Sequence, residues 1–288
     1  EGDRLAFSTD SYVIDPLFFP GGNIGKLAIC GTANDVAVSG AIPRYLSCGF
    51  ILEEGLPMET LKAVVTSMAE TARAAGIAIV TGDTKVVQRG AVDKLFINTA
   101  GMGAIPANIH WGAQTLTAGD VLLVSGTLGD HGATILNLRE QLGLDGELVS
   151  DCAVLTPLIQ TLRDIPGVKA LRDATRGGVN AVVHEFAAAC GCGIELSEAA
   201  LPVKPAVRGV CELLGLDALN FANEGKLVIA VERNAAEQVL AALHSHPLGK
   251  DAALIGEVVE RKGVRLAGLY GVKRTLDLPH AEPLPRIC

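Results

Sequence analysis

Short apolar segments that alternate with segments of helical periodicity constrain this chain more than any other feature of its sequence. In the first half the predicted strands are Leu5–Ile14, Tyr45–Leu52, Ile77–Val80 and Leu95–Ala100, and the predicted helices are Ile24–Ser39 and Met58–Ala72. Apolar residues of the second helix recur every three or four positions, which is the period of an amphipathic helix. The alternation favours an α/β fold, in which helices cover a sheet.

A break in this pattern divides the chain into two predicted domains. The segment Ile105–Asp120 contains Pro106, Asn108 and Gly112 and predicts a loop. The pattern then restarts with a buried strand at Val121–Val124, a helix from about His131, helices near Val154–Leu162, Gly178–Cys190, Ala206–Leu214 and Ala235–His244, and strands near Ile194–Leu196, Leu227–Val231 and Leu254–Val258. We expect one α/β domain over residues 1–113 and another over residues 114–265, of the α+β type with mixed sheets.

The end of the chain differs from the rest. From Gly268 onward it contains Pro279, Pro283 and Pro285 but few apolar residues. We therefore predict a mobile tail over residues 266–288. The ten residues that separate Leu278 from Cys288 would reach about 30 Å if largely extended, at roughly 3.1 Å per residue. Such a tail is long enough to bring its last residue into a site or to leave it in solvent.

Composition excludes several classes of function. A net charge of −8 and a pI near 5.3 argue against nucleic acid as the main partner. No apolar stretch approaches the roughly 18 residues of a membrane span. The chain begins at Glu1 with neither Met nor a signal peptide, so we expect its native N-terminus to be missing. Seven cysteines without a C-x-x-C pair indicate reduced thiols in a cytoplasmic protein.

Four aspartates at strand ends or among small residues are the candidate site. Neither a P-loop motif nor a G-x-G-x-x-G motif is present. The aspartates are Asp10 in the first strand, Asp35 within the first helix, Asp83 after the strand Ile77–Val80, and Asp173 ahead of the helix Gly178–Cys190. Magnesium commonly joins protein carboxylates to nucleotide phosphates, so together they predict a magnesium–polyphosphate site. Taken singly, Asp83 also fits a turn and Asp173 a turn or a helix entry.

Several motifs in this order support a family resemblance. They are Thr9-Asp10, Asn34-Asp35-Val36-Ala37-Val38-Ser39-Gly40-Ala41, Thr81-Gly82-Asp83-Thr84 and Asp173-Ala174-Thr175-Arg176-Gly177-Gly178. The series resembles the ATP-binding superfamily of aminoimidazole ribonucleotide synthetase, thiamine-monophosphate kinase and selenophosphate synthetase. Within it, the runs Phe18–Gly22 and Gly82–Val87 and the terminal Pro285-Arg286-Ile287-Cys288 are similar to the HypE family of hydrogenase maturation factors. The resemblance covers essentially the whole chain, which begins after the glycine-rich segment that helps cover the phosphates in that family.

The resemblance implies an ATP-dependent carbamoyl dehydratase. A carbamoyltransferase partner similar to HypF would load a carbamoyl group onto Cys288, and the enzyme would dehydrate it to a thiocyanate. The product would supply cyanide to the iron of nickel–iron hydrogenase through an acceptor complex similar to HypC and HypD. The family also implies a homodimer that pairs through its N-terminal domains.

The same resemblance assigns the site residues. It implies that Asn34, Asp35, Asp83, Thr84 and Asp173 bind ATP, and that Asp10, Asp35, Asp83 and Asp173 hold Mg²⁺. It assigns proton handling to Lys85 and Glu224, and the chemistry itself to Cys288. From the sequence alone, Lys85 and Glu224 also read as surface charges beside turns.

Two other functions stay open at this level. The chain is also compatible with another ATP-dependent small-molecule kinase or synthetase of the same superfamily, in which the tail takes no part. A non-enzymatic metal or thiol scaffold is the second alternative, with Cys190, Cys192 and Cys288 as soft ligands.

Overall fold

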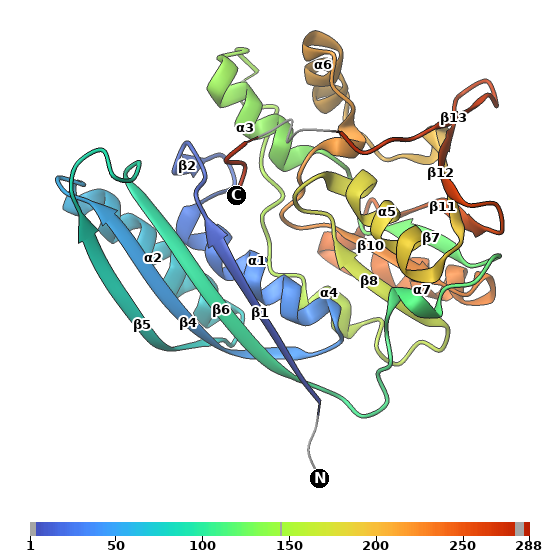
Figure 1. Cartoon of the computed structure of the whole chain (residues 1–288), viewed down its shortest axis with the longest axis horizontal. Coiled ribbons are helices and arrows are strands. Elements are labelled where there is room, and N and C mark those ends of the chain that lie inside the picture. The colour runs from blue at the N-terminus through green and yellow to red at the C-terminus, as the bar shows by residue number, and fades with distance from the viewer. Residues whose placement is uncertain (1–3, 145, 280–284) are drawn as a thin grey trace.

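The first of two α/β domains is built on a four-stranded sheet. The structure, a computed structural model, describes residues 4–144, 146–279 and 285–288 (Figure 1). The strand order is β1-β6-β4-β5, with β1 Arg4–Tyr12, β4 Ile42–Glu53, β5 Ala78–Val87 and β6 Leu95–Ile105. The helices α1 Ile24–Val38 and α2 Met58–Ala74 cover one face, and a hairpin of β2 Phe18–Phe19 and β3 Gly22–Asn23 precedes α1.

A seven-stranded sheet forms the second domain. Its order is β13-β12-β9-β11-β7-β10-β8, with β7 Val121–Val124, β8 Val168–Asp173, β9 Gly193–Ser197, β10 Leu227–Val231, β11 Ala253–Val259, β12 Gly263–Ala267 and β13 Lys273–Thr275. The helices are α3 Asp130–Glu140, α4 Thr156–Gln160, α5 Gly178–Cys190, α6 Pro205–Leu214 and α7 Ala236–His244, with 3₁₀ turns at Ala113–Thr115, Glu198–Ala200, Ala218–Asn220, Arg233–Ala235 and Pro247–Gly249. Parallel pairs β4–β5 and β9–β12 stand among antiparallel ones, which confirms the predicted mixed sheets.

The unbroken apolar sequence of β7 follows from burial on both faces of the second sheet. Leu122 and Val124 belong to a core that includes α5, whereas Val121 and Leu123 belong to a core that includes α4 and α7. A strand with both faces covered has no solvent side and therefore no need for alternating polar residues. The prediction of a buried strand at Val121–Val124 is confirmed.

Helix α1 is buried around nearly its whole circumference. Of its 15 residues, only Lys26 and Asp35 are not fully buried. The helix contacts β1, β6 and α2 of its own domain, and also β8 and α4 of the second domain. Its many small residues permit these close approaches, and a helix that is apolar all round is expected to be buried.

Parts of the sequence-based prediction are wrong. The strand predicted over Ile77–Val80 continues as β5 to Val87, so Asp83 lies within a strand and does not follow one. The segment from Gly268 is not devoid of regular structure, because β13 joins the second sheet and Leu276 is buried. Strands β2, β3, β8, β12 and β13 were not predicted. The mobility of the tail stays a prediction.

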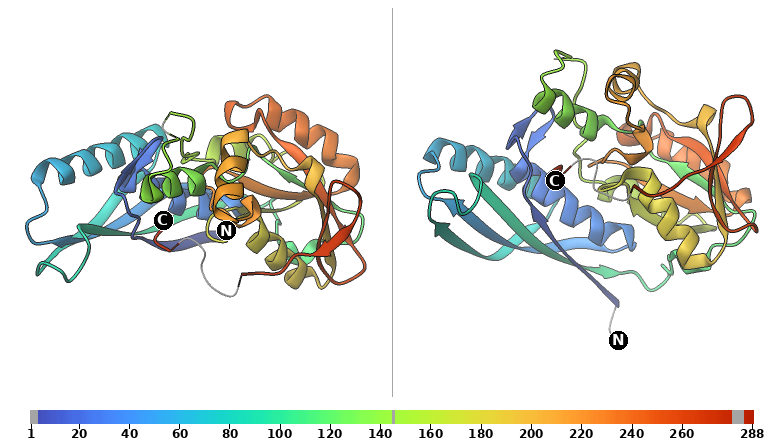
Figure 2. Two further views of the ribbon diagram at one scale, coloured as in Figure 1. Left: turned by 90° about the horizontal axis from the view of Figure 1, so that it is seen from above. Right: turned by 45° about the horizontal axis from the view of Figure 1, so that its top comes forward.

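The last four residues lie between the two domains, in contact with Val13 and Asp93 of the first and with His131 and Arg139 of the second. In both views of Figure 2 the C-terminus lies beside β2 and α3. Among the described residues, no helix has the length and hydropathy of a membrane-crossing segment.

Two helical glycines should respond oppositely to replacement by alanine. A Cβ on Gly25 would lie 2.3 Å from the carbonyl oxygen of Val64 in α2, so Gly25→Ala should destabilise the fold by about 2 kcal/mol through overpacking. A Cβ on Gly209 in α6 would meet open space, so Gly209→Ala should stabilise by up to about 1 kcal/mol. Urea denaturation measures both changes, and equal effects would contradict this account of the α1–α2 contact.

Candidate active site

A cavity of about 560 Å³ joins the two domains and contains most of the predicted site. Its lining residues are Thr9, Asp10, Ser11, Val13, Gly31, Asp35, Asn98, Arg172, Asp173, Thr175, Arg176, Glu224 and Cys288. The lining residues between Thr9 and Asn98 come mainly from strand β1, helix α1 and strand β6. Most of the others come from the end of β8, the loop after it and the loop before β10. Residues distant in sequence therefore meet because α1 packs against β8.

Three carboxylates enter this cavity from three different elements. Asp10 lies on β1, Asp35 on α1 and Asp173 at the end of β8. The hydroxyl of Ser8 donates to Asp35 at 2.7 Å. Neither oxygen of the buried Asp173 has a hydrogen-bond partner among the described residues. Burial, reinforced by the negative charge of Asp35, raises the pKa of Asp173 to about 7.

This donor set fits a divalent cation that also binds phosphate. A buried carboxylate without a donor is costly unless a ligand or cation reaches it. Burial is the main cause of the raised pKa of Asp10, and the charge of Asp35 adds to it. In the part of the chain that the structure describes, no three side chains already converge as a complete metal site. Magnesium commonly takes one or two carboxylates and fills its remaining positions with water and substrate phosphate, so Asp10, Asp35 and Asp173 suit it.

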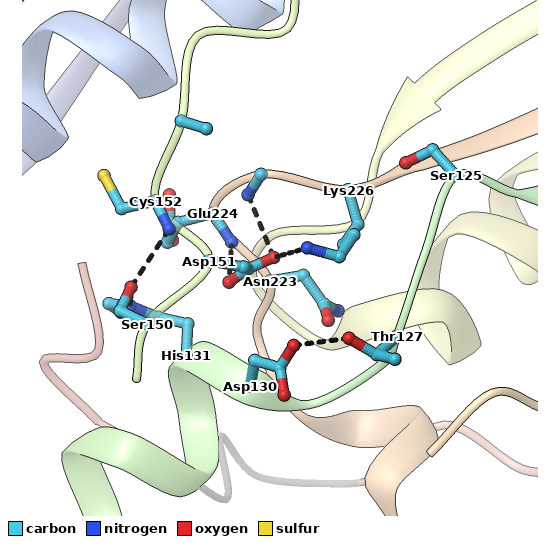
Figure 3. A network of polar contacts seen from close by, with 12 residues as sticks. Ser125, Thr127, Asp130, His131, Ser150, Asp151, Cys152, Asn223, Glu224 and Lys226 are labelled. Atoms are coloured by element: carbon cyan, nitrogen blue, oxygen red, sulfur yellow. Dashed lines mark hydrogen bonds and ion pairs between the residues drawn. The ribbon is translucent and has the colours of Figure 1, made fainter. Parts of the chain in front are cut away.

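Glu224 is a buried carboxyl group that lines the cavity, and Figure 3 shows it beside Asp151. Its Oε1 atom has no hydrogen-bond partner among the described residues. Burial raises the pKa of Glu224 well above its usual value, and the negative charge of Asp151 is among the smaller causes. A raised pKa makes the Glu224 carboxylate a stronger base than an exposed one, which suits a role in acid–base catalysis.

Cys288 reaches the same cavity because the terminal peptide is held by its backbone. The amide of Val13 donates to a backbone carboxylate oxygen of Cys288 at 2.9 Å, and His131 on α3 bonds the carbonyl of Ile287 at 2.8 Å. Arg139 donates to the carbonyl of Pro285 at 2.7 Å and also to that of Arg286. The side chain of Ile287 is buried in an apolar core to which both domains contribute. These contacts seat the chain end and leave the Cys288 side chain at the cavity.

Arg286 fastens this peptide to the first domain. Its Nε donates to the carbonyl of Val13 at 2.9 Å, and its Nη1 forms an ion pair of 2.8 Å with Asp93. The guanidinium also lies over the ring of Phe96, 6.0 Å from the ring centroid. The terminal Pro-Arg-Ile-Cys sequence therefore combines an anchoring cation, a buried apolar residue and the thiol that borders the cavity.

Three predicted site residues lie elsewhere in the single chain. Asp83, Thr84 and Lys85 are on the exposed edge strand β5 and do not line the cavity that contains Glu224. Asp83 and Lys85 form an ion pair of 3.3 Å in which their side chains are 70% and 71% exposed. The shared role in proton handling that the resemblance implies would require Lys85 and Glu224 to meet. Within one chain they do not.

Asn34 has structural partners in this fold. Its Nδ2 donates to the carbonyl of Ala153 at 2.9 Å, and its Oδ1 accepts from the amide of Leu155 at 2.7 Å. The buried side chain thereby ties α1 to the loop that precedes α4. These contacts occupy both ends of the amide. The role of Asn34 in ATP binding stays a prediction.

The sequence reasoning missed three residues around the site. His131 and Arg139 hold the terminal peptide, and Asp151 lies behind Glu224. Each acts on a partner more than 70 positions away in the sequence, so local patterns carried no signal for them. Arg176 lines the cavity and belongs to the Asp173–Gly178 motif, which did contain a usable signal.

Comparison with known proteins identifies the family. Residues 1–105 match the N-terminal domain of AIR synthase related proteins, and residues 117–268 match their C-terminal domain. The carbamoyl dehydratase HypE of Rhodobacter capsulatus is 50% identical over 290 residues, which cover 100% of this chain and 85% of that protein. The chain belongs to the HypE family.

Solved HypE structures share the fold throughout. A crystal structure of E. coli HypE, a hydrogenase maturation protein, is 98% identical with a TM-score of 0.99 and covers 100% of this chain and 89% of its own. A HypE in complex with ATP is 46% identical with a TM-score of 0.96, covering 100% and 88%. A HypE–HypF complex matches at 48% identity and a TM-score of 0.93, covering 96% and 90%.

His131 should make stability depend on pH. Burial lowers its pKa, so the folded state holds it neutral, with Nε2–H donating to Ile287 and Nδ1 accepting from the hydroxyl of Ser150. Because the unfolded chain binds the proton more readily, stability contributed by neutral His131 is present above pH about 6.5 and is lost as the pH falls. In urea denaturation at pH 7.5 and 5.5, His131→Gln should lose less stability on acidification than the wild type.

The exposed His244 provides a matched control for this experiment, since it also bonds a backbone carbonyl. His244→Gln should retain the wild-type dependence on pH. An unchanged dependence in His131→Gln would contradict the assignment of a neutral ring.

Proposed function

We propose that this protein is an ATP-dependent carbamoyl dehydratase that acts on its own C-terminal cysteine. It converts S-carbamoyl-Cys288 to S-cyano-Cys288, while ATP becomes ADP and phosphate. The observation that carries the proposal is that Cys288, Glu224 and the cation-suited carboxylates line one cavity. In this cytoplasmic protein the thiocyanate supplies cyanide ligands for the iron of nickel–iron hydrogenase.

The use of ATP follows from the chemistry of the leaving group. Removing water from a carbamoyl group requires the loss of its oxygen, and oxide is a very poor leaving group. Transfer of the γ-phosphoryl group to that oxygen converts it into phosphate, which leaves readily as the carbon–nitrogen triple bond forms. The relative crystallised with ATP supports this choice of co-substrate.

The cavity residues divide the remaining tasks. Asp10, Asp35 and Asp173 would hold Mg²⁺, which offsets negative charge on the phosphates when bound. Glu224 takes a proton from the carbamoyl nitrogen, because its carboxyl lies in the same cavity as Cys288 and has a raised pKa. Asp83 and Thr84 complete the nucleotide site, and Lys85 shares the proton transfer.

A homodimer accounts for the distance of Lys85 from Glu224 in one chain. Among the described residues, the edge strands β1 and β5 of the first sheet each pair on one side only, and Leu5 and Phe7 on β1 are 67% and 68% exposed. Val80 and Val86 on β5 are exposed as well. Open edges with apolar side chains are suited to pairing with a second copy. In this dimer, β5 of one subunit brings Asp83, Thr84 and Lys85 to the cavity of the other.

Two further partners complete the reaction sequence. A carbamoyltransferase similar to HypF loads Cys288, and a complex similar to HypC and HypD accepts the cyanide. The relative crystallised with HypF supports the first partner.

The dimer arrangement predicts complementation between inactive variants. Lys85→Ala and Glu224→Ala should each be inactive alone, but co-expression should restore about a quarter of the sites, because half of random dimers are mixed and each has one intact site. The measurement is thiocyanate formation per subunit. Absence of recovery in verified mixed dimers would show that both residues act from the same chain.

Mass spectrometry of the C-terminal peptide tests the function itself. After incubation with the carbamoyltransferase and Mg-ATP, the full-length wild-type protein should carry a carbamoyl adduct that then loses one water. Cys288→Ala should carry no adduct, yet its stability should stay within about 0.5 kcal/mol of wild type, because its backbone contacts remain. Glu224→Ala should stop at the carbamoyl stage. A thiocyanate in Cys288→Ala, or ATP turnover that needs only a diffusible acceptor, would contradict the proposal.

A further inference from the structure

Asp151 is a buried carboxylate to which the proposed reaction assigns no task. It lies directly behind Glu224, and its side chain is 3% exposed (Figure 3). One carboxylate oxygen accepts from the amide of Glu224 at 3.1 Å, and the other accepts from the amide of Gly225 at 3.1 Å. The ammonium group of Lys226 completes its shell at 3.2 Å. Three consecutive residues of the catalytic loop therefore converge on a single carboxylate.

Backbone contacts lock the two segments together. The amide of Ala153 donates to the carbonyl of Glu224 at 3.2 Å. A Cβ on Gly225 would lie only 1.9 Å from the carbonyl oxygen of Asp151, so only glycine permits this approach. The backbone on both sides of Glu224 is thus fixed, whereas its Oε1 has no partner among the described residues.

The electrostatics keep Asp151 ionised at this position. Burial opposes its charge, but the positive charge of Lys226 and the amide bonds from the loop outweigh burial, and the pKa of Asp151 is lowered overall. An ionised carboxylate is the strongest acceptor available for two backbone amides. Asp151 does not line the cavity, so it acts through Glu224 and not on the substrate.

We propose that Asp151 is a positioning residue for the dehydration step: it holds the backbone of residues 224–226 so that the Glu224 carboxyl is aimed at the carbamoyl group on Cys288. This inference rests on the proposed function, in which Glu224 removes the proton. The motif Asn223-Glu224-Gly225-Lys226 would then work together with Asp151, which lies 73 positions before Glu224 in the sequence.

The test is single-turnover dehydration by the full-length protein, loaded by its carbamoyltransferase. Asp151→Asn should load normally and show an unchanged half-saturating ATP concentration. Its rate constant for thiocyanate formation should fall roughly tenfold to a hundredfold, because a misplaced catalytic group costs this much. If Asp151→Asn does not fold, Asp151→Ser, which keeps one oxygen acceptor in a smaller side chain, takes its place.

Asp120→Asn is the matched control. Asp120 is also a buried aspartate, 6% exposed at its side chain, with a lysine partner at 2.9 Å and a backbone amide donor, that of Thr117, at 2.7 Å. It does not line the cavity and makes no contact with the 224–226 loop among those that the structure records. Its dehydration rate should match the wild type, even if its stability falls as much as that of Asp151→Asn.

A double-mutant cycle separates positioning from general destabilisation. Glu224→Asp keeps a carboxylate but already displaces it, so adding Asp151→Asn should cost less than about threefold more if Asp151 acts through Glu224. A loss of the same factor in both backgrounds overturns the inference, and so does a rate loss matched by weaker ATP binding. If the wild type dehydrates and Asp151→Asn is equally fast, only this inference fails. If the wild type forms no thiocyanate, the proposed function fails and takes the inference with it.

Discussion

The burial of α1 between the two domains is the constraint on which the rest of the structure depends. One side of the helix packs on the first sheet and α2, and the other contacts β8 and α4. Its single half-buried acidic residue, Asp35, consequently faces the cavity where both domains meet. Asn34, one position earlier, fixes the loop before α4. A helix free on one side would hold neither the domain arrangement nor the carboxylates of the site.

The terminal peptide is attached in a way that suits a carrier. Its anchors are backbone hydrogen bonds, one ion pair and one buried side chain, Ile287. The reacting thiol takes no part in the anchors of Arg286 and Ile287. At Cys288 the anchor is a backbone oxygen, which accepts from the amide of Val13, so modification of the thiol would leave the anchoring contacts in place.

Strong burial patterns made much of the fold predictable, and remote polar contacts limited the rest. The apolar run Val121–Val124 indicated a buried strand, and Asp35 among the small residues of the first helix indicated the site. The second half of β5 could not be predicted, because an exposed edge strand has no burial pattern, and Asp83 was therefore placed after the strand. His131 and Asp151 gave no local signal, since the groups that they hold lie far along the chain and the contacts arise only on folding.

The fate of the carbamoyl oxygen tests the central claim most directly. Cys288 is loaded with a carbamoyl group labelled with ¹⁸O, Mg-ATP is added for a single turnover, and the phosphate is analysed by mass spectrometry. If ATP phosphorylates the carbamoyl oxygen at the cavity shared by Cys288 and Glu224, the label must appear in inorganic phosphate, with one labelled phosphate for each thiocyanate formed. Label recovered in water, with unlabelled phosphate, would contradict this account.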